Sequence, residues 1–541
     1  MSQPTSSLAD LFPLASNIPA DYAAVLPVET REYLVDGELR RWTGPVEDIV
    51  SPILVREDAG LVPVRLGSCP VLGAEEGREA LAAACRAFGR GRGHWPTLGV
   101  AGRIAAVEDF ARRLAERREV IVRLMSWEIG KSLEGSSVEF DRTVEYLRDT
   151  VDALRELESA SSGPTAEGGI LGRIRRTPLG VALCMGPFNY PLNETFATLI
   201  PALIMGNTVI MKTPKLGRLL FAPLMECFRD SFPAGVINVI SGGRDMLAPI
   251  MASGQVNVLA FIGTSRAAGA LRGLHPKPHR LRCVLGMEAK NAAIVLPDAD
   301  LELTVAECVR GALGFNGQRC TALKMLFVAR EREAEFLERF LAGVAQLSVG
   351  MPWRAGVNIT PLPEPGKVPY LRALVEDALA QGAAIANPGG GAYCETLFAP
   401  TVLSGVLPGM RIAREEQFGP LVPIAAYDDI EEPLEYIAQS DYGQQVSLFG
   451  TDPDQLGALI DPLINQVCRV NLNTKCQRGP DSFPFTGRKD SAEGTLSVTD
   501  ALRAFSIRTL VAARDTASGQ DLFASLRRPG VSSFLSDESV R

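Results

Sequence analysis

Short, unbroken apolar runs separated by helix-like segments are the feature that most constrains the fold of this chain. VALCMGPF, NTVIMK, GVINVIS and VNVLAFIG follow one another between residues 181 and 263. Strands with one solvent-exposed face alternate polar and apolar residues, whereas continuous apolar runs are typical of strands buried on both faces. The pattern therefore predicts an α/β domain built on a parallel sheet.

A second set of apolar runs follows further along the chain. MLFVAR, LVPIAAY and VSLFG are separated by the helical patterns EAEFLERFLAGVAQL and YLRALVEDALAQG. A second α/β domain is the economical interpretation.

Two other kinds of sequence pattern complete the organisation of the chain. Residues 106–133 and 136–154 space their apolar residues three and four apart, which predicts helices. Residues 162–180 break this pattern with Gly, Pro and Thr and then alternate, which suits a projecting hairpin.

The length of 541 residues also calls for more than one core. We expect a first domain from 1–160 and 179–290, a second domain from 291–503, and an arm and tail from 161–178 and 504–541.

Charge and residue counts exclude several classes of protein. A net charge of −8 argues against nucleic-acid binding, although a local basic pocket for a small anion stays open. The ten cysteines form no CxxC pair and the three histidines are too scattered for a zinc site, so we expect no metal. No stretch has the length of a membrane helix, and the N-terminus lacks a signal-peptide pattern. We therefore expect a cytoplasmic protein with reduced thiols and no membrane partner.

GFNGQRCTALK, residues 314–324, contains the candidate nucleophile, Cys320. A lone cysteine is most often an inert core residue. Here Gly317, Gln318 and Arg319 offer close backbone N–H groups and a cation, both of which lower the pKa of a thiol. The motif favours a reactive Cys320.

PLGVALCMGPFNYPLN, residues 178–193, ends a predicted strand in a Gly-Pro turn that carries Asn189 and Tyr190. Asparagine in a turn is usually only a turn former. Ligands of open α/β sheets bind beyond the carboxyl ends of the strands, so the Asn189 amide is also well placed to stabilise an oxyanion.

Three later turns are candidates for a phosphate-bearing ligand. NTVIMKTPK places Lys212 and Lys215 after a strand, and strand–glycine–helix turns lie at Gly243 and at Gly263–Thr264. The GxGxxG fingerprint is absent, and each turn is a weak signal by itself.

The motifs PFNYPLN, MKTPK, FIGTS, GFNGQRCTALK, REEQFGP and FPFTG, in this order and spacing, resemble the aldehyde dehydrogenase superfamily over about residues 25–515. Within it, QRCTALK and KCQRGPDSFPFTGRKDS are similar to the NADP-dependent, non-phosphorylating glyceraldehyde-3-phosphate dehydrogenases. The resemblance implies two α/β domains, one for the cofactor and one for catalysis, and a small β oligomerisation arm that joins copies into a dimer or tetramer.

The resemblance also implies roles for particular residues. Cys320 would be the nucleophile and Asn189 the oxyanion donor, and Glu416 and Phe418 would lie near the nicotinamide riboside. Substrate-binding residues for a phosphorylated aldehyde map onto Arg142, Tyr190, Arg319, Thr321 and Arg478.

Lys215 stands where NAD-preferring members commonly have a carboxylate, which favours NADP as the cofactor, because a cation attracts the 2′-phosphate that a carboxylate would repel.

One position departs from the family pattern. The deacylation base normally heads a Glu-Leu-Gly-Gly-Lys sequence, but the aligned stretch here is GMEAK, with Gly286 at the expected position. We expect Glu288 to replace it, because residues two apart in an extended segment project to the same side. Other interpretations stay open: an oxidation of another anionic aldehyde, transfer of the acyl group to coenzyme A, or a catalytically silent binding protein on the same fold.

Overall fold

The structure is a computed structural model that describes residues 7–161 and 163–536. Residues 1–6, 162 and 537–541, which belong to the expected first domain, arm and tail, lie outside the described residues.

The first apolar runs form the centre of an eight-stranded sheet in the order β24-β12-β11-β8-β9-β10-β2-β3. Its core, β8 to β12, pairs in parallel, as the sequence predicts. The strands are β2 (Glu32–Val35), β3 (Glu38–Arg41), β8 (Val181–Met185), β9 (Thr208–Lys212), β10 (Ile237–Ile240), β11 (Val256–Ile262), β12 (Arg282–Gly286) and β24 (Ala492–Glu493).

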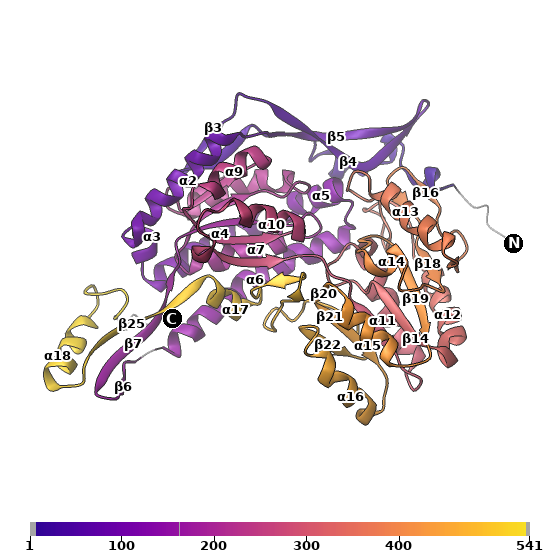
Figure 1. Ribbon diagram of the computed structural model, residues 1–541. Helices are drawn as coiled ribbons and strands as arrows, with labels where there is room; N and C mark the ends of the chain where they lie inside the picture. Colours follow the sequence, from indigo (N-terminus) through magenta and orange to yellow (C-terminus); the bar gives the residue numbers. More distant parts are fainter. Residues whose placement is uncertain (1–6, 162, 537–541) are drawn as a thin grey trace.

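Helices cover both faces of this sheet (Figure 1). Alternate residues of one strand enter different cores: Val258 and Ala260 of β11 belong to one cluster and Leu259 to another. One face carries α2 (Ala74–Phe88), α9 (Arg244–Ala252) and α10 (Ser265–Leu274). The other carries α4 (Val100–Ala115), α5 (Arg118–Ile129), α6 (Leu133–Ser159), α7 (Asn193–Ile204) and α8 (Met225–Ser231).

The second set of runs forms a seven-stranded sheet in the order β15-β18-β19-β14-β13-β21-β22. All its pairs are parallel except that of β15 with β18. The strands are β13 (Ala292–Val295), β14 (Met325–Ala329), β15 (Ala384–Ile385), β18 (Thr401–Ser404), β19 (Leu421–Tyr427), β21 (Gln445–Phe449) and β22 (Arg469–Leu472).

Helices again pack on both faces of the second sheet. One face buries α11 (Leu301–Leu313) and α12 (Arg330–Ala345). The other buries α13 (Lys367–Ala380), α14 (Arg411–Arg414), α15 (Glu431–Gln439) and α16 (Pro453–Leu463). The predicted second α/β domain is confirmed.

The expected hairpin projects from the body as part of a three-stranded antiparallel arm (Figure 1). It consists of β6 (Thr165–Glu167), β7 (Ile170–Pro178) and β25 (Ser506–Arg514), with α17 (Val498–Ala504) leading into it and α18 (Ala517–Leu526) following it. Residues 533 and 534 pack here as well, because Arg175 donates to the carbonyls of Ser533 and Phe534.

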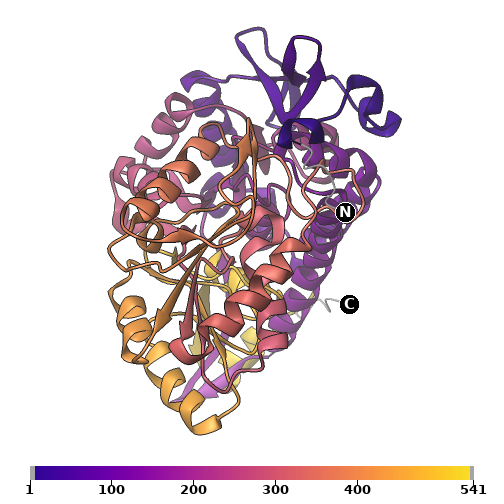
Figure 2. The same cartoon turned by 90° about the vertical axis from the view of Figure 1, so that its right-hand side faces the viewer.

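The sequence did not predict the sheet near the N-terminus. It is built of β1 (Val28–Glu29), β4 (Val46–Glu57) and β5 (Gly60–Pro70). The long β4–β5 hairpin lies across the top of the molecule in Figure 1 and projects upward from it, in indigo and purple, in Figure 2. The shorter elements are α1 (Ala20–Ala23), α3 (His94–Thr97), β16 (Tyr393–Cys394), β17 (Leu397–Phe398), β20 (Tyr442–Gly443) and β23 (Arg488–Lys489), together with the 3₁₀ turns η1 (Leu8–Leu11), η2 (Ala15–Asn17), η3 (Gly89–Gly91), η4 (Leu219–Leu224), η5 (Pro278–Arg280) and η6 (Gly314–Gly317). Within residues 7–161 and 163–536, no helix is both long and apolar enough to cross a membrane.

Candidate active site

A cavity of about 1230 Å³ lies at the carboxyl ends of the first sheet's strands. Met185, Lys212, Ile262 and Gly286, which end β8, β9, β11 and β12, all line it. Every site residue that the sequence predicts also lines this one cavity: Arg142, Asn189, Tyr190, Lys212, Lys215, Gly243, Gly263, Thr264, Glu288, Arg319, Cys320, Thr321, Glu416, Phe418 and Arg478. Its volume exceeds that of a typical small-molecule site, which leaves room for a dinucleotide beside a substrate.

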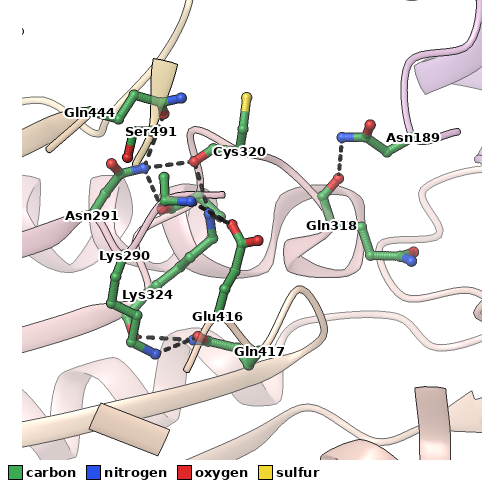
Figure 3. A network of polar contacts seen from close by, with 12 residues as sticks. Asn189, Lys290, Asn291, Gln318, Cys320, Lys324, Glu416, Gln417, Gln444 and Ser491 are labelled. Atoms are coloured by element: carbon green, nitrogen blue, oxygen red, sulfur yellow. Dashed lines mark hydrogen bonds and ion pairs between the residues drawn. The ribbon is translucent and has the colours of Figure 1, made fainter. Parts of the chain in front are cut away.

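A network of polar contacts fixes the backbone of Cys320 (Figure 3). The Cys320 carbonyl accepts hydrogen bonds from Asn291 Nδ2 and Lys324 Nζ, both at 2.8 Å. Lys324 Nζ also pairs with Glu416 Oε1 at 2.6 Å. The Cys320 sulfur points away from this network, which leaves it available to the cavity (Figure 3).

The expected low pKa of the Cys320 thiol is wrong for this state of the protein. Burial, followed by the charge of Glu194, raises the pKa of Cys320 above its ordinary value, and Lys324 and Arg478 offset this only in part. The Cys320 thiol therefore holds its proton more tightly than an ordinary cysteine does, and a proton acceptor is needed before its sulfur can act as a nucleophile.

Arg319 does not point its charge at the neighbouring cysteine. Its Nη2 donates to the carbonyls of Arg310 at 3.0 Å and Gly311 at 2.6 Å, and its Nε donates to Gly314 at 3.1 Å. A cation at the last carbonyls of α11 is favoured by the helix dipole. Arg319 thus closes the end of α11 and still lines the cavity.

Asn189 is tied to the cysteine loop. Its side chain is 6% exposed, and Nδ2 donates to the Gln318 carbonyl at 2.8 Å (Figure 3). The Asn189 carbonyl accepts from the buried Lys131, whose Nζ lies 3.4 Å from the centre of the Tyr190 ring. These contacts hold the PFNYP turn against the loop that carries Cys320.

Two of the predicted phosphate-binding arginines are paired with carboxylates. Arg142 donates to both oxygens of Asp481 at 2.7 and 2.8 Å, and Arg478 donates to Asp481 at 3.2 Å. Arg478 Nη1 also forms an ion pair with Glu194. The sequence reasoning missed both carboxylates, although Asp481 stands inside the quoted CQRGPDS and Glu194 directly follows PFNYPLN.

Glu416 and Phe418 stand together on the loop before β19. Glu416 Oε1 accepts from the Ala289 N–H at 3.1 Å as well as from Lys324. Phe418 has a φ of 44° and its ring lies 5.9 Å from that of Phe188. Lys324, which stands in the quoted motif without a predicted role, thus links the cysteine loop to the Glu416 loop.

Cations and the N-terminal ends of two helices line the other part of the cavity. Burial, followed by repulsion from Arg218 and Lys215, lowers the pKa of Lys212 to about 8. Lys215 is exposed. A Cβ at Gly243, ahead of α9, would meet no atom within 4 Å, so the backbone there is open to a ligand. Thr264 caps α10 by accepting from the Ala267 N–H at 3.2 Å.

The segment 286–288 has no carboxylate at its first position. Glu288 Oε2 accepts from the Ser265 N–H at 2.8 Å, at the start of α10. Gly286 has space around it, because a Cβ there would lie 3.4 and 3.5 Å from Ile262. In the part of the chain that the structure describes, no group of three or more His, Cys, Asp or Glu side chains is placed to hold a metal ion.

Comparison with known proteins agrees with this geometry. Residues 64–511 match the aldehyde dehydrogenase family. An NADP-dependent glyceraldehyde-3-phosphate dehydrogenase of Streptococcus equinus is 33% identical over 454 residues, which cover 81% of this chain and 91% of that protein. A chloroplastic betaine aldehyde dehydrogenase of Beta vulgaris is 27% identical over 83% of this chain and 90% of its own length. The crystal structure of an NADP-dependent glyceraldehyde-3-phosphate dehydrogenase from Bacillus halodurans C-125, complexed with NADP, is 31% identical and superimposes with a TM-score of 0.82, covering 90% of this chain and all of that one.

Proposed function

The chain belongs to the aldehyde dehydrogenase family, and we propose that it oxidises glyceraldehyde 3-phosphate to 3-phosphoglycerate with NADP and without inorganic phosphate. The observation that carries this proposal is the placement of Cys320 and Asn189 in one cavity with Arg142, Arg319 and Arg478. The names of the Streptococcus and Bacillus relatives support it.

The chain's own groups account for the first half of the reaction. The Cys320 thiol gives its proton to water in the cavity, its sulfur adds to the aldehyde carbon, and the carbonyl oxygen becomes an oxyanion. The second N–H of Asn189 Nδ2 and the Cys320 backbone N–H would donate to that oxygen. Loss of a hydride then converts the thiohemiacetal to a thioester, and water releases the acid and restores the thiol.

NADP fits the donor set of the cavity. Lys212 and Lys215 supply positive charge, and Gly243 and Thr264 stand at the N-terminal ends of α9 and α10, where the helix dipole favours a dinucleotide's phosphates. Gly263 lines the same part of the cavity. Glu416 and Phe418 would lie by the nicotinamide riboside. When bound, NADP supplies the acceptor of the hydride.

The substrate's phosphate would be bound by Arg142, Tyr190, Arg319, Thr321 and Arg478. Guanidinium groups present paired N–H donors that match phosphate oxygens. Several guanidinium groups along the same cavity would therefore favour a phosphorylated aldehyde over a neutral one. The projecting arm would join copies of the chain into a dimer or tetramer.

Glu288 is the proposed base for deacylation. To reach water at the thioester, its carboxylate would have to leave the Ser265 N–H that it now accepts from. Rapid mixing of Glu288→Gln with aldehyde and NADP should give a normal first turnover of NADPH followed by a stalled steady state. Unchanged steady-state turnover would remove Glu288 from the mechanism.

Gly286 and the Glu288–Ser265 contact favour one second candidate function. With no carboxylate at Gly286, the thioester could pass to a thiol such as coenzyme A instead of to water. In that case the enzyme would be an acylating dehydrogenase.

An activity matrix of NADP and NAD against several aldehydes, with and without coenzyme A, tests the proposal. Glyceraldehyde 3-phosphate with NADP and no coenzyme A should give the highest kcat/KM. A strict need for coenzyme A would favour the acylating function, a preference for another aldehyde would reassign the substrate, and no turnover at all would indicate a binding protein.

A further inference from the structure

Glu194 is a carboxylate on the cavity wall that the proposed reaction does not use. It lies in the first turn of α7, is 7% exposed and forms an ion pair with Arg478. Only Oε2 has this partner; within the described ranges, Oε1 accepts no hydrogen bond. A buried ionised carboxylate needs a compensating cation, and here Arg478 provides it.

The ion pair continues into a chain of alternating charges. Arg478 donates to Asp481, and Asp481 accepts two hydrogen bonds from Arg142. Burial lowers the pKa of Arg478, but the Glu194 and Asp481 carboxylates outweigh it and hold that pKa above its ordinary value. Two carboxylates therefore cancel the charge of the two arginines.

This cancellation matters for the binding of an anion. A phosphate placed against Arg478 would come close to Glu194, and like charges in a buried site repel each other strongly. Arg319 differs, because its donors contact backbone carbonyls, which leave its charge uncancelled.

We propose that Glu194 is a specificity-determining residue whose carboxylate competes with the substrate's phosphate for the Arg478 guanidinium. This inference rests on the proposed function, since it concerns the phosphate subsite of that same cavity. Glu194 keeps Arg478 paired when no substrate is bound, and it limits the preference for a phosphorylated over an unphosphorylated aldehyde.

The variant Glu194→Gln tests this competition. It keeps the shape of the side chain and an oxygen that can accept from Arg478, but it removes the negative charge. Because no carboxylate then competes for Arg478, the KM for glyceraldehyde 3-phosphate should fall about tenfold, which corresponds to about 1.4 kcal/mol. The KM for glyceraldehyde should stay within about twofold. Because the Glu194 charge also raises the pKa of Cys320, any change in kcat should be the same for both aldehydes.

Glu364→Gln is the matched control. Glu364 lines the same cavity but pairs with Lys367 at 2.9 Å, so the variant removes one negative charge away from Arg478. If Glu364→Gln lowered the KM for glyceraldehyde 3-phosphate by an equal factor, the loss of any negative charge from the cavity would explain the result, and the proposal would be overturned. A rise or no change in the KM for glyceraldehyde 3-phosphate in Glu194→Gln would overturn it as well.

Equilibrium titration separates this inference from the proposed function. 3-Phosphoglycerate and glycerate are titrated calorimetrically into the full-length wild type and Glu194→Gln, which requires no turnover. Tighter binding of 3-phosphoglycerate alone supports the role of Glu194, even if the enzyme prefers another aldehyde. Unchanged affinity overturns that role, even if glyceraldehyde 3-phosphate proves to be the substrate.

Discussion

Truncation of Asn189 should slow the first chemical step. Nδ2 carries two N–H groups, and the Gln318 carbonyl takes one of them at 2.8 Å, which leaves one donor for the oxyanion. Removing one such donor costs about 100- to 1,000-fold in kcat, or about 2.7–4 kcal/mol of transition-state stabilisation. Asn189→Ala should show this loss in the NADPH burst rate by stopped-flow absorbance. The KM for the aldehyde should change little, because the bond strengthens only as charge develops on the oxygen.

Two control variants make the Asn189 result specific. Asn189→Asp keeps the shape but places a carboxylate oxygen against the Gln318 carbonyl, so it should lose at least as much activity. Asn193→Ala truncates a neighbouring buried amide that has no hydrogen-bond partner within the described part of the chain, and it should retain its burst rate. An Asn189→Ala burst within threefold of the wild type would refute the oxyanion role.

Three further results are expected. Lys215→Glu should reverse or flatten the preference for NADP over NAD, because it restores a carboxylate that repels the 2′-phosphate; an unchanged ratio of kcat/KM values would place the determinant elsewhere. Since the pKa of Lys212 is lowered to about 8, its charge is present below that pH and lost above it, so the KM for NADP should rise as pH increases through about 8. Lys212→Arg should remove this rise, and a flat wild-type profile would count against the role of Lys212. Gly286→Glu should speed the steady state if deacylation limits it, because a Cβ there meets Ile262 only at ordinary contact distance; a rate that stays slow after a normal burst would argue against this position.

The parallel sheets were predictable because their strands are buried on both faces. β8, β9, β10 and β11 coincide with the apolar runs in the sequence, and β14, β19 and β21 coincide with the second set. β4 and β5 were not predicted, because each has one continuous buried stretch, 51–55 in β4 and 66–70 in β5, and these stretches contain Ser, Pro and Gly. A periodicity argument has little to detect in such strands.

The site divides in the same way between predictable and unpredictable features. The motif residues line one cavity, as expected for residues that follow parallel strands, because the carboxyl ends of such strands share an edge. The ion-pair partners of the charged side chains could not be predicted from the sequence, because these pairs join residues that are far apart in the chain. Arg142 and Asp481 are one case, and Glu194 and Arg478 are another. The pKa of Cys320 was mispredicted for the same reason: burial and Glu194 raise it, and Lys324 and Arg478 offset this only in part. The sequence-adjacent Arg319 donates instead to the carbonyls at the end of α11.

The most direct test of the account is a single-turnover experiment in buffer without inorganic phosphate. The enzyme is mixed with NADP and glyceraldehyde 3-phosphate, NADPH is followed through the first turnover, and the quenched protein is digested for peptide mass spectrometry. We expect one NADPH per active site, a phosphoglyceryl thioester on Cys320, and 3-phosphoglycerate as the released product. No NADPH with this aldehyde, or an acyl group on a residue other than Cys320, would contradict it.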